Sequence, residues 1–222
     1  SFAEITENKS GQTGQHIKRV SEYSKIIAQQ LGLSQERVES IRIASTMHDV
    51  GKLLIPSEIL EKPGRLTAEE YMTIKTHTSL GGQLLENVEG EEMRLSRTIA
   101  LQHHERYDGK GYPDRLANEA IPFEARIICV ADSYDAMTSD RVYRDHLPQN
   151  VVRYEIERNA GTQFDPDVAR AMLEIIDEDT PVTVLMGEDA QRPLCERVVR
   201  FLKKVNRNYT VIDSKDCALP GI

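Results

Sequence analysis

The 222-residue sequence is poor in several residue types, and each shortage excludes a class of protein. It has no tryptophan, and aromatic residues make up only 5%, so a sheet-rich aromatic core is not expected. The three cysteines, Cys129, Cys195 and Cys217, are odd in number and scattered, which argues against a disulfide framework and favours a reducing compartment. The longest strictly apolar run, residues 127–131, is too short to span a bilayer.

Basic residues are in the minority as well. The sequence has 28 Lys and Arg against 36 Asp and Glu, which gives a formal charge of −8. A broad positive surface for a nucleic-acid polymer or for a membrane is therefore not expected. No signal-peptide pattern opens the chain, so the expected location is the cytoplasm.

Apolar residues at helical spacing dominate as far as about residue 178. A helix ending near Gly32 is predicted by residues that are three and four positions apart: Ile17, Val20, Ser24, Ile27 and Leu31. Ser34 is expected to cap the next helix, and Thr67 and Glu70 form a capping box. Behind this box, one helix is predicted to carry the following residues on one face: Ile74, His77, Gly81 and Leu84.

Further helices are predicted from about residue 91 to the His103–His104 pair, over 149–160, and from the Asp165–Pro166 pair to about residue 177. Pro122 suits the first turn of another helix, which carries Asp132 and Asp135 three residues apart. The two loops that stand out are residues 55–66 and 107–121, because both contain glycine and proline.

After Thr180 the pattern changes to a strand at 182–186, a helix at 193–205 and a second strand at 209–213. A β-α-β unit of this size buries little surface alone. We therefore expect an all-α domain over residues 1–178, followed by a small β-α-β appendage over 179–222.

Five of the six histidines stand on predicted helix faces or at helix ends, near two aspartates. Burying so many polar rings without partners costs a few kcal/mol each, and a shared metal removes most of that cost. The metal-ligand candidates are His16, His48, Asp49, His77, His103, His104 and Asp132. The set contains no cysteine, so it suits iron, manganese, zinc or nickel rather than a structural cysteine–zinc site.

Seven candidates are too many for one ion but suit two ions bridged by a carboxylate. Such a pair can hold the oxygens of an in-line phosphoryl displacement, and a water between the ions loses much of its proton affinity and becomes the nucleophile. The ions would also supply the positive charge that an acidic chain needs to hold an anion.

Several motifs resemble one protein family. The segment HDVGK, residues 48–52, resembles the signature of the HD phosphohydrolase superfamily, and HHERYDGKGYP, residues 103–113, resembles the extended motif of its HD-GYP branch. ADSYDAMTSDR at 131–141 and AGTQFDP at 160–166 also match that branch. The resemblance covers roughly residues 10–178.

The resemblance implies an all-α, HD-type helical bundle that hydrolyses cyclic di-GMP, a bacterial second messenger, at a site of two or three metal ions, usually iron or manganese. It assigns all seven candidates as metal ligands, with Asp49 bridging. Lys52, placed one helical turn beyond His48, would contact the phosphate or help to protonate the leaving oxygen. The implied substrate-binding residues are Arg141, Arg144, Tyr112 and Asp135, the last of which would orient Lys52 or an arginine.

Members of this family with a third metal carry a glutamate four residues before the first histidine, where this chain has Gln12. An amide is a poor ligand for a hard cation, so two ions are expected. In the family, loss of the third ion tends to accompany release of linear pGpG rather than GMP.

The C-terminal tail shows a weaker similarity. Residues 192–198 resemble the opening of a glutaredoxin, but Arg192 stands where the first cysteine of the dithiol belongs, so Cys195 has no such partner. A small packing module is the favoured interpretation of this segment.

Three hypotheses for function remain open at this point. The first is the cyclic di-GMP phosphodiesterase, and the second is a degenerate module that senses the nucleotide or binds a partner without turnover. The third is hydrolysis of another phosphoester, such as a 3′,3′-linked hybrid cyclic dinucleotide; the GYP motif disfavours a nucleotide monoester. The family also implies an upstream sensory or receiver domain and is compatible with a homodimer.

Overall fold

The computed structural model describes residues 15–140, 146–179, 182–186 and 209–213. The chain divides into two compact units, Ser1–Leu173 and Glu174–Ile222. In the second unit, β1 (Val182–Met186) and β2 (Tyr209–Asp213) form a parallel pair in which Val182 is opposite Tyr209. Both predicted strands are confirmed, whereas the helix predicted over 193–205 lies outside the described residues.

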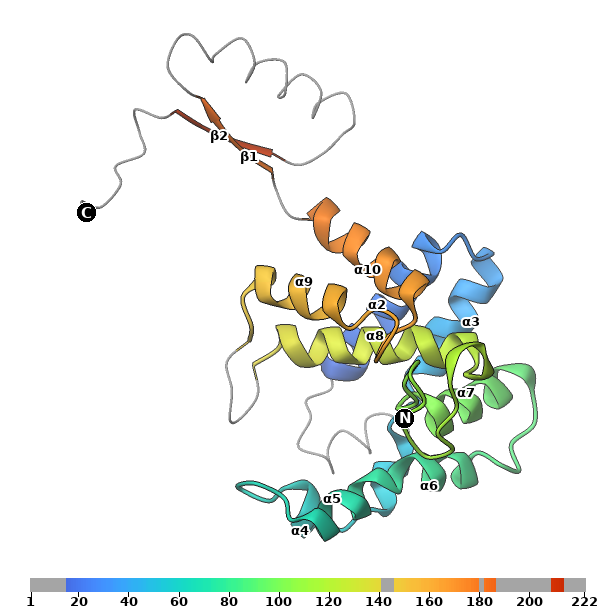
Figure 1. The fold of residues 1–222 in the computed structure, drawn as a ribbon. Helices are drawn as coiled ribbons and strands as arrows, with labels where there is room; N and C mark the ends of the chain where they lie inside the picture. Colours follow the sequence, from blue (N-terminus) through green and yellow to red (C-terminus); the bar gives the residue numbers. More distant parts are fainter. Residues whose placement is uncertain (1–14, 141–145, 180–181, 187–208, 214–222) are drawn as a thin grey trace. The chain divides into compact units, whose positions relative to one another are not determined.

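Four helices of the first unit form a closed ring. These are α2 (Gln15–Gln30), α3 (Gln35–Ser45), α7 (Glu91–Gln102) and α8 (Phe123–Thr138), and α2 and α7 each pack against both α3 and α8 (Figure 1). Side chains buried inside this ring include Val20, Ile27, Ile41, Ile99, Ile127 and Ile128. Each fully buried isoleucine contributes about 2 kcal/mol of transfer free energy, so the predicted apolar faces account for the bundle.

Local signals set several helix ends as the sequence predicts. The Ser34 side chain accepts a hydrogen bond from the backbone N–H of Arg37 at the start of α3. The Thr67–Glu70 capping box is present at the start of α5 (Ala68–Lys75). At the start of α10 (Pro166–Asp179), Asp165 accepts from the backbone N–H of Asp167. Pro122 takes the N-cap position of α8 rather than its first turn.

The single helix predicted behind Thr67 is wrong, because it breaks at Thr76 into α5 and α6 (His77–Leu84). The reason is a competing hydrogen bond. The Nδ1 atom of His77 binds the backbone oxygen of Ile74 at 2.7 Å, in the last turn of α5. α6 then packs against α7 and against η1 (Val50–Leu54), a 3₁₀ turn.

Three further elements complete the first unit. α4 (Ser57–Leu60) and η2 (Asn118–Ala120) are short turns within the two predicted loops. α9 (Gln149–Arg158) packs against α8. In the part of the chain that the structure describes, no helix is both long and apolar enough to cross a membrane.

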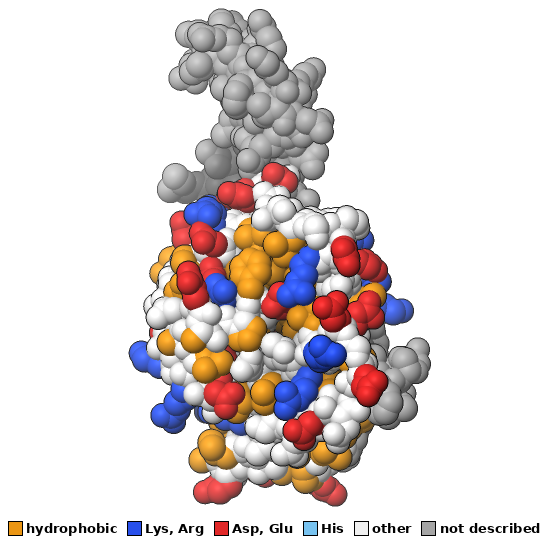
Figure 2. All heavy atoms as spheres, turned by 90° about the vertical axis from the view of Figure 1, so that its right-hand side faces the viewer, with side chains coloured by type: hydrophobic (Ala, Val, Ile, Leu, Met, Phe, Trp, Pro, Cys, Tyr) orange, Lys and Arg blue, Asp and Glu red, His pale blue; other side chains and the backbone are white. Residues whose placement is uncertain are grey.

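The surface in Figure 2 is mixed in character. Acidic, basic and hydrophobic side chains are interspersed there, and no single charge covers the face.

Candidate metal centre

The His48–Asp49 pair lies in the turn between α3 and η1. α3 ends at Ser45, and Lys52 stands in the 3₁₀ turn that follows Asp49. The expectation that Lys52 projects from the same helix face as His48 is therefore wrong, because no α-helix joins them. Lys52 still reaches the site, since its ammonium lies 2.5 Å from Oδ2 of Asp49.

Gly51 allows this turn to approach α6 closely. A Cβ atom built at Gly51 would lie 1.8 Å from the backbone oxygen of His77 and 2.5 Å from the backbone nitrogen of Gly81. Only a residue without a side chain fits there. The close backbone contact brings His77 beside Asp49, although the two residues are on different elements.

Asp49 is the centre of the site, and its two oxygens face different histidines. Oδ2 lies 3.3 Å from Nε2 of His48, whereas Oδ1 lies 3.3 Å from Nε2 of His77 and 3.8 Å from Nε2 of His103. The potential ligand atoms form two compact groups that share Asp49, and within each group they lie within 4.8 Å of one another. The two groups are Asp49, His77, His103 and His104, and His16, His48 and Asp49.

The imidazoles are oriented by backbone carbonyl groups. Nδ1 of His48 binds the oxygen of Ser45 at 2.8 Å, and Nδ1 of His103 binds that of Ile99 at 3.0 Å. His77 has the equivalent bond to Ile74. A carbonyl only accepts, so Nδ1 carries the proton in each ring, and the lone pair on Nε2 faces Asp49.

A carboxylate replaces the carbonyl for the fourth histidine. Nδ1 of His16 lies 2.7 Å from Oδ2 of the buried Asp135, and Nε2 of His16 lies 3.6 Å from Oδ1 of Asp132. Arg19, one turn beyond His16 on α2, binds the same carboxylate with Nε 2.5 Å from Oδ1. Asp135 thus orients His16 and Arg19, whereas Lys52 pairs with Asp49.

His104 lies at the edge of the site against the GYP loop, residues 107–121. The Tyr112 ring stacks on His104 with ring centroids 4.9 Å apart, and the backbone N–H of Tyr112 donates to the His104 carbonyl at 3.2 Å. The buried Glu105 accepts the backbone N–H of Asp114 at 2.7 Å, which closes the loop. These contacts hold the tyrosine ring beside the histidines.

A second segment fixes the start of the GYP loop. The backbone N–H groups of Tyr107 and Asp108 donate to the carbonyl oxygens of Gln163 and Thr162, at 3.2 and 2.8 Å. The Gln163 side chain contacts Arg106 and Ser133. The 160–166 motif therefore holds the start of the GYP loop in place.

The site favours an ionised carboxylate at Asp49 and neutral imidazoles at three of the surrounding histidines. Burial would raise the pKa of Asp49, but the Lys52 ammonium and the His48 imidazole hold this pKa well below its usual range. Burial lowers the pKa of His77 and of His103, and it lowers the pKa of His104 to about 3. Burial also acts to lower the pKa of His48, but the Asp49 and Asp132 carboxylates and the Ser45 carbonyl together raise this pKa. Neutral imidazoles and a carboxylate are the forms that bind metal ions.

These residues fit a metal centre by a criterion independent of motif. Nε2 of His16 and Nε2 of His48 are buried without a hydrogen-bond partner among the described residues, although both rings are oriented through Nδ1. Buried acceptors without partners cost about 1–3 kcal/mol each, which a bound cation would offset. The donors are nitrogen and oxygen only, as suits iron, manganese or zinc.

The structure thus brings together all seven predicted ligand residues from three helices, α2, α6 and α8, and from the turns that follow α3 and α7, with Lys52 and Tyr112 beside them. Arg141, Arg144 and Gln12 lie outside the described residues, so their predicted roles stay predictions. Sequence reasoning missed Arg19 and Gly51. Arg19 could have been found from its position three residues after His16 on the same predicted helix. The role of Gly51 depends on a contact with a distant segment.

Comparisons with known proteins agree with this geometry. The family model described as "HD domain" matches residues 1–168. A cyclic di-GMP phosphodiesterase response regulator of Xanthomonas campestris pv. campestris is 42% identical over 172 residues, which are 78% of this chain and 46% of the relative. A 3′3′-cGAMP-specific phosphodiesterase of Vibrio cholerae serotype O1 is 37% identical over 177 residues, 80% of this chain and 34% of the relative. The chain spans about half the length of these relatives or less.

A solved structure supports the fold. The HDG"Y"P protein of Bdellovibrio bacteriovorus superposes with a TM-score of 0.57 at 18% identity, covering 72% of this chain and 51% of that chain. At this identity the likeness concerns the fold alone, and it confirms the helical, HD-type architecture.

Proposed function

Because the chain belongs to the HD domain family, we propose that it is a metal-dependent phosphodiesterase that hydrolyses cyclic di-GMP. The observation that carries the proposal is the position of Asp49, whose two oxygens face two separate groups of imidazole nitrogens. One carboxylate shared by two ligand groups is what a pair of ions needs. The names of the relatives in Xanthomonas and Vibrio support a cyclic dinucleotide as substrate.

The residues around Asp49 would hold two ions, of iron or manganese. His77, His103 and His104 face one side of the carboxylate, and His16 and His48 face the other, with Asp132 beside His16. When bound, such ions lower the pKa of a coordinated water and neutralise phosphate oxygens. The protein's own part is to orient the rings through Nδ1 and to keep Asp49 ionised.

Lys52 would supply a positive charge that is not a metal ligand. Its ammonium lies beside Asp49, and its side chain is 15% exposed. A protonated amine has no free lone pair, so its role would be to donate hydrogen bonds to the phosphate, where negative charge develops during attack. Arg141 and Arg144, which are not among the described residues, would hold the phosphates.

The proposed product is linear pGpG, with slow conversion to GMP. The basis is Gln12, which stands where relatives with three ions have a glutamate. Two ions suffice to open one phosphodiester bond, so a site without a third ion is compatible with release of the linear dinucleotide.

A second candidate substrate is a 3′,3′-linked cyclic GMP–AMP hybrid. The Vibrio relative named for that substrate is 37% identical to this chain. A sensor without turnover is less well supported, because all seven ligand positions are retained and six of them lie in compact groups around Asp49.

The test is metal and product analysis of protein purified without oxygen, with cyclic di-GMP and the hybrid supplied in parallel. We expect about two ions per chain, pGpG as the main product and loss of turnover after chelation. Asp49→Asn should lose metal and activity together while the helical circular dichroism persists. Asp167→Asn is the matched control, because Asp167 forms an exposed ion pair with Arg170 on α10. An Asp49→Asn variant with normal metal content and turnover would refute the proposal.

A further inference from the structure

A pocket lies beside the metal centre, between the α5–α6 break and the GYP loop. Its lining includes Lys75 and Thr76 from one side and Lys110, Tyr112 and Arg115 from the other. The pocket adjoins the metal centre at two points, because Thr76 precedes His77 in the chain and Tyr112 stacks on His104. The pocket is therefore next to the residues that surround Asp49.

The three basic side chains of the pocket form no ion pair within 4.0 Å among the residues that the structure describes, although Lys110 is near enough to Asp108 to help lower the pKa of that carboxyl. Elsewhere in the described part, basic side chains are commonly paired, as in Lys62–Glu70, Arg106–Asp108 and Arg126–Asp165. The chain as a whole carries eight more acidic than basic residues. Three unpaired cations around one pocket in such a chain indicate a site for an anion.

Lys75 is held in place by aromatic rings rather than by a counter-charge. Its Nζ lies 4.8 Å from the ring centroid of Tyr71 and 5.0 Å from that of Tyr112. Tyr71 is four residues before Lys75 on α5, so the pair shares one helix face. Such contacts stabilise the half-buried ammonium and leave its charge available. The ammonium is positioned at the pocket wall before any ligand arrives.

We infer that this pocket is an anion subsite for the phosphate of the substrate that is not cleaved. The inference rests on the proposed function, because a cyclic dinucleotide carries two phosphodiester groups in one ring. With one of them at Asp49, the other must lie a short distance away on the same macrocycle. The Lys75 ammonium lies over the Tyr112 ring. The pocket would therefore bind a ligand through its positive charge and not by stacking on this ring.

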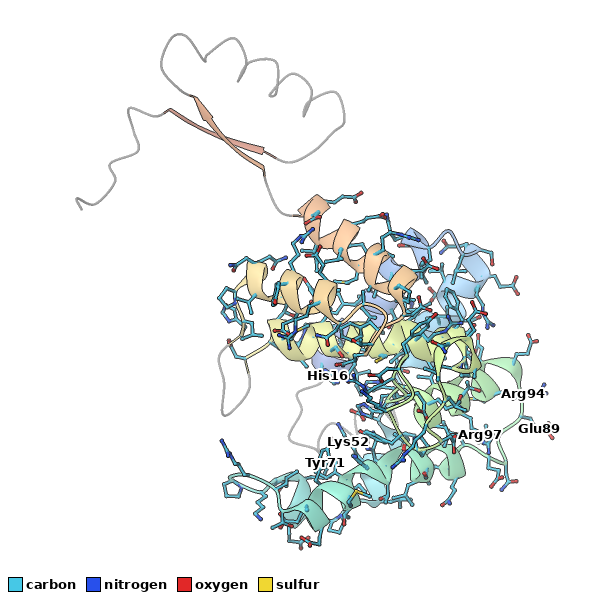
Figure 3. All side chains as sticks on the ribbon, viewed as in Figure 1. His16, Lys52, Tyr71, Glu89, Arg94 and Arg97 are labelled. Atoms are coloured by element: carbon cyan, nitrogen blue, oxygen red, sulfur yellow. The ribbon has the colours of Figure 1, made fainter. Side chains whose placement is uncertain are left out.

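Two substrates separate this subsite from the metal centre. Cyclic di-GMP has the second phosphate, whereas bis(p-nitrophenyl) phosphate is a single phosphodiester without one. The variants are Lys75→Gln, Arg115→Gln and the double variant. Arg94→Gln is the control, because Arg94 is also exposed and without an ion pair among the described residues. Figure 3 shows Arg94 on the other side of the view from Lys52 and Tyr71.

Each pocket variant should raise KM for cyclic di-GMP about 3- to 10-fold, the scale of one partly exposed charge contact, with kcat changed much less. The ratio of kcat/KM for cyclic di-GMP to that for bis(p-nitrophenyl) phosphate should fall by a similar factor, and Arg94→Gln should leave it unchanged. An unchanged ratio in the double variant overturns the inference. This includes the case in which kcat/KM falls equally for both substrates, which would indicate a general disturbance of the site.

If the proposed hydrolysis is not observed, the subsite is tested by binding. If the metal-loaded wild-type protein does not hydrolyse cyclic di-GMP, binding of fluorescently labelled cyclic di-GMP is measured by anisotropy instead. Weaker binding by the double variant than by Arg94→Gln supports the subsite even without turnover. Equal binding by the two proteins, or no binding by the wild type, overturns it.

Discussion

Replacing Gly51 by alanine tests how tightly η1 and α6 are packed. The added Cβ would lie 1.8 Å from the backbone oxygen of His77, and contacts below 3.0 Å essentially never occur, so the two backbones must separate by about 1.2 Å. Both groups are backbone atoms, and no side-chain rotation can relieve the clash. Overpacking of this kind costs about 1–3 kcal/mol, so the free energy of unfolding should fall by at least that amount.

The same separation should disturb the metal centre. His77 lies 3.3 Å from Asp49 only because α6 touches η1, so moving α6 withdraws one imidazole from the shared carboxylate. Metal-depleted Gly51→Ala protein should unfold at a lower urea concentration than metal-depleted wild type. After reconstitution it should hold less metal.

Gly82→Ala is the matched control on α6. Its Cβ would meet Cδ1 of Leu101 at 3.2 Å, the far end of a flexible side chain, and alanine favours the helix over glycine by about 1 kcal/mol. That variant should be as stable as wild type or slightly more so. A Gly51→Ala protein that unfolds at the wild-type urea concentration and retains its metal would show that this close contact does not position α6.

Three other substitutions test separate parts of the site. Lys52→Ala should keep the metal content but lower kcat by about two to three orders of magnitude, as measured by steady-state kinetics; an unchanged kcat would assign the phosphate to other groups. Asp135→Asn should weaken metal binding by about 10- to 100-fold in a competition titration with a chelator, because His16 and Arg19 lose their shared carboxylate. Gln12→Glu should increase the metal content or the yield of GMP on chromatography; rapid GMP formation by the wild type would contradict the two-ion hypothesis.

Much of the fold could be predicted because its signals are local. The Ser34 cap and the Thr67–Glu70 box depend on residues three apart, and they appear as expected. The break at Thr76 could not be predicted, because it requires the His77 side chain to take the Ile74 carbonyl from the helix. That outcome depends on where α6 packs, which is tertiary information.

The candidate site also could be predicted only in part. The ligand residues were predicted from histidines on helix faces and ends and from the family resemblance, and the structure brings His16, His77 and Asp132 to the His48–Asp49 turn. The path of the chain after His48 was predicted wrongly, because a helical spacing was assumed where the backbone forms a 3₁₀ turn. Lys75 carried no signal of its own, since a lone lysine on a helix usually faces solvent.

The hydrogen bonds that orient the histidines also complete the ends of helices. Ser45 is the last residue of α3, and Ile99 lies in the last turn of α7. Each carbonyl accepts a backbone N–H, from His48 at 3.2 Å and from His103 at 3.0 Å, and Nδ1 of the same histidine is its second donor at the helix end. His48 and His103 therefore act as C-terminal caps, and the partial negative charge at the ends of α3 and α7 is directed toward the imidazoles. This field makes Nε2 a stronger electron-pair donor and attracts cations. Replacing either histidine thus changes a helix terminus as well as a ligand, and the stability of such a variant must be compared with that of metal-free wild type.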